Sequence, residues 1–295
     1  MMKTGFITLI GRPNAGKSTL INRFVGEKVS IVTWRPQTTR NKITGVLNGE
    51  GYQAIFVDTP GLHSATDGLS RYMMQSIEAA LDGIDCLLYL CDVARGVSRE
   101  DLEYLSKAVK TVPAVVVAVN KTDCVAKETL FAELTKLNAT EGIKAIVPVS
   151  AKRGDNTDKL LKLLTDLLPE GEPQYSEDVL TDKSTRFMCG EIIREKALKL
   201  LEKEIPYGIS VLVTKFEQRA DKPIYDINAD IVCDRKNHKS VIIGKGGSML
   251  KKIATEARVD MEELLETKVF LTLYVKADEG WRDSAYLLNE LGYGE

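Results

Sequence analysis

The sequence predicts an α/β domain, with a mostly parallel sheet flanked by helices, followed by a smaller α+β domain. Two observations lead to this prediction. In residues 1–168, short aliphatic runs alternate with longer amphipathic stretches, as in parallel strands joined by helices. After the acidic segment "PEGEPQYSEDVL", which prolines interrupt, the order becomes helix, two strands, two helices, strand and helix. We therefore expect domains at 1–168 and 183–295, with a linker at 169–182.

The elements of the first domain follow from its aliphatic runs. "CLLYLC", "AVVVAV" and "KAIVPV" are rich in aliphatic residues, as strands covered on both faces are. The expected strands are 4–10, 41–47, 52–57, 86–91, 114–119 and 144–149, and the expected helices are 18–25, 98–110, 127–137 and 157–168. In the second domain we expect a helix at 184–203, strands at 209–216, 225–233 and 268–275, two helices around "IIGKGG", and a last helix from Trp281.

Composition narrows the class of protein. The chain has 295 residues, of which 44% are hydrophobic and 28% charged, as in an ordinary globular protein. Its net charge of -2 means that a nucleic-acid site must be a local patch. The five cysteines are scattered without a CxxC pair, which argues against a disulfide framework or a zinc site. No apolar run is long enough for a signal peptide or a membrane span, so we expect a cytoplasmic protein.

A glycine-rich stretch, "GRPNAGKS", lies between the first expected strand and helix and fits the P-loop pattern G-x-x-x-x-G-K-[ST]. Its glycines let the backbone wrap around phosphate, so that N–H groups point inward at a helix N-terminus. Lys17 supplies charge to the outer phosphates, and the Ser18 hydroxyl can ligate Mg²⁺. The residues expected to bind nucleotide here are Gly11, Arg12, Pro13, Asn14, Ala15, Gly16, Lys17, Ser18 and Thr19.

A second motif, "DTPG", ends the strand "YQAIFV", at the sheet edge that faces a nucleotide. Asp58 is expected to hold the metal, with Thr59 and Pro60 beside it, and the Gly61 N–H to sense the terminal phosphate. In the preceding loop, "QTTR", Thr39 is expected to bind Mg²⁺ and the γ-phosphate, with Thr38 as the alternative. The metal ligands are thus Ser18, Thr39 and Asp58, and the catalytic residues are Lys17, Thr39 and Gly61.

Leu62 stands where Ras-like proteins carry a glutamine that positions water. Leucine cannot orient water, so we expect slow intrinsic hydrolysis that is helped from elsewhere. Asn14 is expected to place a monovalent cation, K⁺, as in similar GTPases that lack the glutamine. His63 is interpreted as a turn residue rather than a base, and Arg40 as a solvated loop arginine rather than a catalytic one.

Two further motifs select the base. "NKTD" directly follows the strand "AVVVAV", and its aspartate can accept the N1–H and 2-amino groups of guanine, a donor pair that adenine lacks. "VSA" also ends a strand, and its backbone can contact the guanine oxygen. The residues expected to bind here are Asn120, Lys121, Asp123, Ser150, Ala151 and Lys152. The four motifs, in this order, predict a P-loop GTPase of the translation-factor class with GTP as its substrate.

The second domain has a basic stretch, "RKNHKSVIIGKGGSMLKKIAT", which contains no Asp or Glu. "GKGG" fits the GxxG loop of a KH domain, where two helices meet and the missing side chains let an RNA backbone approach. The following helix N-terminus and the lysines add positive charge. The residues expected to bind RNA are Arg235, Lys236, Lys239, Ile242, Ile243, Gly244, Lys245, Gly246, Gly247, Lys251 and Lys252.

The combination resembles the Era family of bacterial GTPases from end to end. The GTPase motifs are shared with other families, whereas "RFMCGEIIREK", "EIPYG", "IIGKGGSMLKKI" and "WRDSAYLLNELGY" carry the resemblance. The family commonly has valine where Ala15 stands, which changes packing and not chemistry. The resemblance implies a type II KH domain that binds the 3′ end of 16S ribosomal RNA and a role in maturation of the small (30S) ribosomal subunit. It also implies peripheral association with the inner membrane.

Three further expectations complete the sequence interpretation. We expect a monomer in which GTP and Mg²⁺ order the loops around Thr39 and Gly61, and in which nucleotide state changes how the RNA groove is presented. One alternative is an RNA-binding assembly factor that uses GTP only as a ligand, which Leu62 keeps open. The other is a GTPase of tRNA modification, although no second catalytic cluster is evident.

Overall fold

The computed structural model describes residues 2–294, which form two compact units. The first unit comprises the chain up to Val32 together with Thr39–Ser64 and Met73–Asp182. The second unit comprises Thr33–Thr38, Ala65–Tyr72 and the chain from Lys183 onward. No helix among the described residues is long and apolar enough to cross a membrane.

The sheet of the first unit is mostly parallel, as the alternating pattern predicts. Strands β1 (Met2–Gly11), β3 (Tyr52–Asp58), β4 (Cys86–Asp92), β5 (Val115–Asn120) and β6 (Ala145–Pro148) are parallel to one another and stand in the order β3-β1-β4-β5-β6. Strand β2 (Ile43–Gly49) extends the sheet antiparallel to β3, and the short β7 (Glu170–Gly171) pairs antiparallel with the start of β1. The carboxyl ends of the parallel strands therefore meet at one edge.

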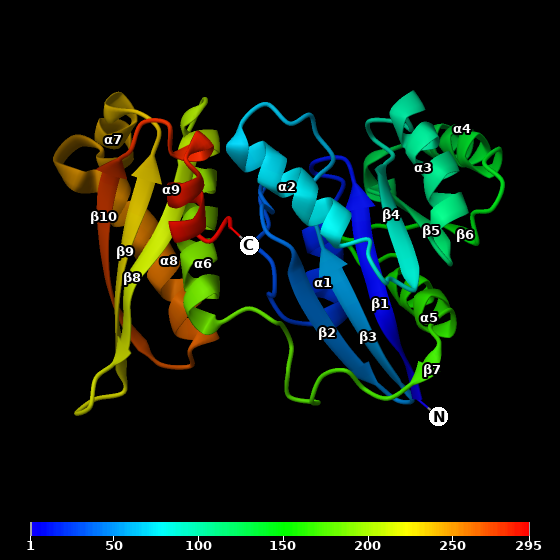
Figure 1. Cartoon of the computed structure of the whole chain (residues 1–295), viewed down its shortest axis with the longest axis horizontal. Helices are drawn as coiled ribbons and strands as arrows, with labels where there is room; N and C mark the ends of the chain where they lie inside the picture. The colour runs from blue at the N-terminus through cyan, green and yellow to red at the C-terminus, as the bar shows by residue number, and fades with distance from the viewer. Residues whose placement is uncertain (1, 295) are drawn as a thin grey trace. The chain divides into compact units, whose positions relative to one another are not determined.

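Helices cover both faces of this sheet (Figure 1). They are α1 (Lys17–Val25), α2 (Gly68–Ala79), α3 (Arg99–Thr111), α4 (Lys127–Asn138) and α5 (Thr157–Asp166). Consecutive strand residues point to opposite faces, so Leu88 packs in the cluster with α1 and α5, and Leu87 packs in the cluster with α2, α3 and α4. Burial on both faces explains why the strands are aliphatic throughout.

Residues 170–182 are tied to the edge of this sheet. The buried Gln53 side chain accepts hydrogen bonds from the N–H groups of Gln174 (2.7 Å) and Tyr175 (3.0 Å) and donates to the Tyr175 carbonyl (2.8 Å). Further along, Val46 N donates to Leu180 O at 2.9 Å, and Thr44 N donates to Asp182 Oδ1 at 3.0 Å. The segment thus covers part of the free edge of β2, which would otherwise expose unpaired backbone groups.

The second unit has the expected α-β-β-α-α-β order. Helix α6 (Thr185–Leu200) precedes β8 (Ile209–Gln218) and β9 (Ile224–Cys233), and α7 (Lys236–Ile243) and α8 (Ser248–Leu264) precede β10 (Lys268–Ala277). The sheet order is β10-β9-β8, with β9 parallel to β10 and antiparallel to β8. One face of the sheet packs on α6 and α8 around a buried aliphatic core. The expected last helix is a 3₁₀ turn at Trp281–Asp283 followed by α9 (Ala285–Glu290).

The segment 33–38 is anchored on helix α6 inside the second unit. Arg35 Nε donates to the carbonyl of Leu198 at 2.5 Å, and its Nη2 donates to the carbonyl of Leu201. These carbonyls end α6 and have no partner within the helix, so the arginine caps it. In return Arg194 of α6, which is buried, donates to the carbonyl of Thr38. The segment 65–72 is held similarly, with Gly68 N donating to Asp283 Oδ1 at 2.8 Å.

Candidate functional site

The P-loop connects β1 to α1, as its position in the sequence predicts. Gly16 is the N-cap of α1 and has a φ of 101°, and a Cβ at this position would lie 2.2 Å from Asn120 Nδ2. Only glycine fits this conformation and this close approach. Asn120 Nδ2 donates to Ala15 O at 2.7 Å, so the loop is supported from behind by the first residue of the base motif.

Four oxygen-bearing side chains gather at the start of α1. Ser18 Oγ lies 2.7 Å from Asp58 Oδ2 and 2.8 Å from Thr39 Oγ1, and Thr39 Oγ1 lies 3.3 Å from Asp58 Oδ2. Ser30, which belongs to none of the predicted motifs, also donates to Asp58 Oδ2 at 2.8 Å. The second oxygen, Asp58 Oδ1, is buried without a hydrogen-bond partner. Hard oxygen donors with one carboxylate fit Mg²⁺, so the residues present suit the implied metal.

The charges of this site are set by burial. Lys17 is almost fully buried and donates to Gly11 O at 3.1 Å. Burial lowers the pKa of Lys17 to about 8, and the nearby Asp58 carboxylate offsets only part of this effect. Burial likewise raises the pKa of Asp58, against the influence of Lys17 and three hydroxyl groups. Phosphate would stabilise the charged lysine, and a divalent cation would stabilise the charged carboxylate.

The "DTPG" motif is held against the P-loop. Leu62 N donates to Gly11 O at 3.1 Å, and Thr59 Oγ1 donates to Leu9 O at 2.7 Å. A Cβ on Gly61 would lie 2.7 Å from Pro13 Cα, so this position also requires glycine. The Leu62 side chain packs against the cluster beneath α2 and α3. This side chain is apolar and has no group that could orient a reacting water.

The surroundings of two residues near this motif, His63 and Arg40, can be compared with the roles predicted for them. His63 Nδ1 lies 2.7 Å from Gly61 O, a contact within one turn that agrees with a turn histidine. Arg40 is 1% exposed, so the prediction of a solvated loop arginine is wrong. The sequence gives no sign of its burial, because "QTTRNK" is polar throughout and looks like an exposed loop.

The base motif is assembled from two strand ends. Asn120 Oδ1 accepts from Ala151 N at 2.9 Å, which ties "NKTD" to "VSA". Ser150 Oγ donates to Asp123 Oδ1 at 2.7 Å, and this hydrogen bond lowers the pKa of Asp123. Lys121 adopts a φ of 66°, and its Nζ lies 2.6 Å from Asp92 Oδ2. Lys152 is exposed at the rim.

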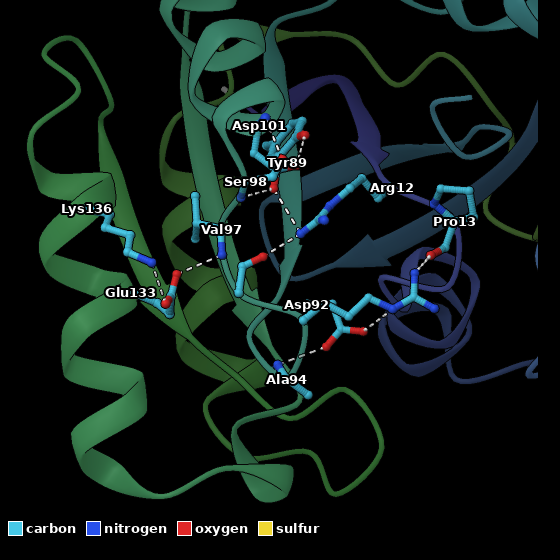
Figure 2. Close-up of polar contacts among 12 residues, drawn as sticks. Arg12, Pro13, Tyr89, Asp92, Ala94, Val97, Ser98, Asp101, Glu133 and Lys136 are labelled. Carbon is cyan, nitrogen blue, oxygen red and sulfur yellow. Dashed lines mark hydrogen bonds and ion pairs between the residues drawn. The ribbon is translucent and has the colours of Figure 1, made fainter. Parts of the chain in front are cut away.

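The side chain of Arg12 points away from its neighbour Pro13, toward Ser98 and Asp101 at the start of α3 (Figure 2). It forms an ion pair with the buried Asp101 at 3.0 Å and donates to the carbonyl of Gly96. Asp101 also accepts from Tyr89 Oη at 2.7 Å. Arg12 therefore supports the P-loop from outside, while its backbone remains part of the loop. Asp92, Asp101 and Tyr89 were missed, since only tertiary packing brings them to the P-loop.

The loop after β4 makes a second contact with the P-loop. Arg95 Nη1 donates to Pro13 O at 3.3 Å, and Arg95 Nε lies 3.7 Å from Asp92 Oδ2. Asp92 Oδ2 also pairs with Lys121 Nζ, and Asp92 Oδ1 accepts a hydrogen bond from Ala94 N at 3.1 Å. Figure 2 shows the contacts of this loop with Pro13 of the phosphate motif, and the contact of Asp92 with Lys121 extends the same loop to the base motif.

In the second unit, the glycine loop joins α7 and α8 as predicted. Gly246 and Gly247 have φ values of 57° and 79°, and a Cβ on either would meet nothing within 4 Å. Glycine is therefore required by the backbone conformation, and the loop faces open space. The predicted cations around it are all exposed: Arg235, Lys236, Lys239, Lys245, Lys251 and Lys252.

One predicted RNA contact needs correction. Ile242 is fully buried in the core of the second unit, so its side chain cannot reach a ligand. Its neighbours differ, because Ile243 is half-buried and Val241 is 50% exposed. The error arises from the helix period: three consecutive aliphatic residues on α7 point in different directions, so Ile242 enters the core, Ile243 packs against its rim and Val241 faces solvent.

Comparison with known proteins identifies two matching families and two similar relatives. A family described as "50S ribosome-binding GTPase" matches residues 6–121, and the KH domain family matches residues 204–282. GTPase Era of Clostridium acetobutylicum is 44% identical over 293 residues, covering 99% of this chain and 98% of that protein. GTPase Era of Clostridium novyi is 43% identical over 295 residues, covering all of both chains.

Two solved structures are similar over the full length of both chains. One is Era in complex with MgGDPNP and nucleotides 1506–1542 of 16S ribosomal RNA, with a TM-score of 0.96 and 35% sequence identity. The other is an Aquifex aeolicus Era variant bound to GDP·AlF4⁻, with a TM-score of 0.95 and 35% identity.

Proposed function

The chain belongs to the Era family of GTPases, and from this premise we propose that it binds the 3′ end of 16S ribosomal RNA and acts in maturation of the small ribosomal subunit. It hydrolyses GTP to GDP and phosphate. The RNA assignment rests on one observation above the others, the full-length similarity to an Era structure that contains this RNA together with a nucleotide.

We assign the hydrolysis roles from the geometry of the phosphate site. Lys17 binds the outer phosphates, and Ser18, Thr39 and Asp58 hold Mg²⁺ directly or through water, as their clustered oxygens suggest. When bound, Mg²⁺ neutralises charge on the phosphate oxygens. The Gly61 N–H contacts the terminal phosphate, because Gly61 packs on Pro13 of the P-loop. Leu62 offers no group that orients water, so intrinsic turnover is slow.

We propose that Asn14 of the P-loop places a K⁺ ion. Asn14 has a φ of 65°, so its backbone lies in the left-handed region, which asparagine tolerates better than most residues. Phosphate release measured in KCl and in NaCl, for the unaltered chain and for Asn14→Ala, tests this role. We expect faster release in KCl for the unaltered chain only, and equal rates in both salts would contradict it.

RNA recognition is assigned to the glycine loop and its exposed cations. The backbone of Gly246 and Gly247 is open to solvent, and Lys245 stands between Gly244 and Gly246. A KH loop of this kind clamps the backbone of single-stranded RNA. Ile243 and Val241, rather than Ile242, are left to contact bases.

A double substitution in the glycine loop tests this assignment. Gly246→Asp with Gly247→Asp introduces two carboxylates that repel phosphate and strains a left-handed backbone, so we expect RNA binding to be lost and GTP binding to remain. Gly292→Asp is a matched control, since Gly292 has a φ of 81° and equally open surroundings. Fluorescence anisotropy with a labelled oligonucleotide from the 3′ end of 16S RNA measures the effect. Retained RNA affinity in the double variant would place the site elsewhere.

We further propose a monomeric, cytoplasmic protein with a fraction associated peripherally with the membrane. This proposal is supported by membership of the family. Cell fractionation followed by a high-salt wash distinguishes a peripheral fraction, which the wash releases, from an embedded one. Recovery of the protein only in the salt-resistant pellet would contradict the proposal.

A further inference from the structure

The sheet of the second unit has one face that the proposed function does not use. Its inner face packs on α6 and α8, whereas its outer face carries two large aromatic side chains on β10. Phe270 is 58% exposed and Tyr274 is 55% exposed. Exposed aromatic rings that lie together on a surface indicate a binding site more often than single exposed residues do.

The two rings form a row along the sheet edge. Strand β10 is the edge strand, and residues four positions apart on a strand lie on the same face, about 13 Å from each other. Thr272 lies between them on this face and is small. The partners on the adjacent strand β9 are Asp226 opposite Phe270 and Asp230 opposite Tyr274. Neither partner is bulky enough to cover a ring.

The acidic groups beside the rings are each paired with a cation. Arg219 donates to Asp226 at 2.7 and 3.0 Å, and its guanidinium carbon lies 5.5 Å from the centre of the Phe270 ring. Lys276 pairs with Asp230 at 2.7 Å, and these contacts lower the pKa of Asp226 and raise the pKa of Lys276. Lys215 lies 3.9 Å from Asp226 and 3.2 Å from Glu217.

Aromatic rings with neighbouring cations are what single-stranded nucleic acids bind. Bases stack on rings regardless of sequence, and cations follow the phosphates. Strand β10 also packs on α7 and α8 with its inner side, so the row of rings lies on the strand that supports the helices of the glycine loop. We propose that the outer face of β10, with Phe270 and Tyr274 as stacking residues, is a second RNA-binding surface for unpaired nucleotides beyond those held at the glycine loop. This inference rests on the proposed RNA-binding function.

RNA length separates the two surfaces in an experiment on the full chain. The probes are unpaired oligonucleotides of 5 and 16 nucleotides from the 3′ end of 16S RNA, and the variants are Phe270→Ala, Tyr274→Ala and the double substitution. We expect each single variant to weaken binding of the long RNA about fivefold or more, with unchanged binding of the short RNA. Tyr286→Ala is the matched control, because Tyr286 is 75% exposed on α9, and we expect it to bind both RNAs as the unaltered chain does.

Three results would overturn the proposal. If the double variant binds the long RNA as tightly as the unaltered chain, the face does not bind RNA, and a protein partner becomes its better occupant. If it weakens both lengths equally, the rings do not form a separate surface. Phe270→Tyr and Tyr274→Phe each keep an aromatic ring. If they weaken binding of the long RNA as much as the alanine variants do, stacking is not the cause. In each case the glycine-loop variant still tests the proposed function, because it should abolish binding of both lengths.

Discussion

Asp123 lies in a short 3₁₀ turn, Thr122–Cys124, directly after the left-handed Lys121. The hydroxyl of Ser150 donates to its carboxylate, and this contact is the largest cause of its lowered pKa. The carboxylate is therefore ionised throughout the neutral range, and a residue of a second motif orients it. Such an acceptor matches the two adjacent donors of guanine, and a base that lacks them leaves it unpaired.

Substitution of this carboxylate should change which base is bound. In Asp123→Asn, an amide replaces one acceptor oxygen with a donor, so we expect GTP affinity to fall on the order of 100-fold or more and xanthosine triphosphate to become the preferred ligand. Asp155→Asn is the control, since Asp155 is an exposed carboxylate of the neighbouring loop. Competition between the two nucleotides in a filter-binding assay measures the preference. Unchanged GTP affinity would remove Asp123 from the base site.

The P-loop, "DTPG", "NKTD" and "VSA" could be placed from the sequence because each comes at the end of a strand, and parallel strands end at one edge. The residues that support these motifs could not be placed from the sequence. Ser30 and Asp101 carry no motif of their own and reach the site through packing between distant segments. Arg40 and Ile242 were misjudged for a related reason, since burial of a single side chain depends on neighbours that local pattern does not reveal.

Helix α3 shows how one element fixes the P-loop. It begins with a capping box, in which Ser98 Oγ accepts from Asp101 N at 3.2 Å and Asp101 Oδ2 accepts from Ser98 N at 2.8 Å. The same carboxylate binds Arg12 and Tyr89. The capping residue is therefore also the anchor of the P-loop arginine, so the start of the helix and the phosphate loop depend on one buried group.

Loss of this anchor should affect both stability and nucleotide binding. In Asp101→Ala, a half-buried guanidinium and a buried hydroxyl lose their partner, so we expect the first unit to lose about 3 kcal/mol of unfolding free energy and some affinity for GTP. Glu103→Ala, in the same helix, removes only a surface pair with Arg99 and should cost less than about 1 kcal/mol. Denaturant-dependent hydrogen exchange in β4 and β5 reports the first unit alone. Equal losses in the two variants would show that the anchor is unimportant.

Most elements were predictable because they have strong periodicity, and the exceptions have physical causes. Helix α2 was not predicted, although Leu69, Met73 and Ile77 are buried at helical spacing, because it begins at a glycine and follows a polar stretch, "HSATD". The prolines and acidic residues of 169–182 predict a linker. Its attachment to the sheet depends on Gln53 of β3, whose side chain binds Gln174 and Tyr175 far away in the sequence, and on backbone N–H groups of β2.

At the scale of the whole molecule, the chain does not divide at a single point. Residues 33–38 belong to the second unit, and the next residue, Thr39, lies in the phosphate site of the first. Arg194 of α6 holds the Thr38 carbonyl while its guanidinium binds Glu191 at 2.6 and 2.7 Å. We therefore propose that a change at Thr39 on hydrolysis acts on the segment that α6 holds, and that this segment couples nucleotide state to RNA binding.

Arg194 allows a direct test of that coupling. We expect the unaltered chain to bind RNA with affinities that differ about fivefold or more between a GTP analogue and GDP, and Arg194→Ala to bring this ratio close to one. Arg186→Ala is the control, because Arg186 lies on the same helix but donates to Val213 O in the adjacent strand β8. RNA titrations with GTP analogue, GDP and no nucleotide give the ratios for each variant. Removal of Arg194 also leaves the buried Glu191 without its partner, so folding of the variant is checked by circular dichroism. Arg194→Lys is a second variant, because it keeps the positive charge beside Glu191 but loses the planar guanidinium that donates to two partners at once. Equal RNA affinity of the unaltered chain in all three nucleotide states would remove the coupling altogether, and a ratio preserved in Arg194→Ala would assign it to the other shared segment, residues 65–72.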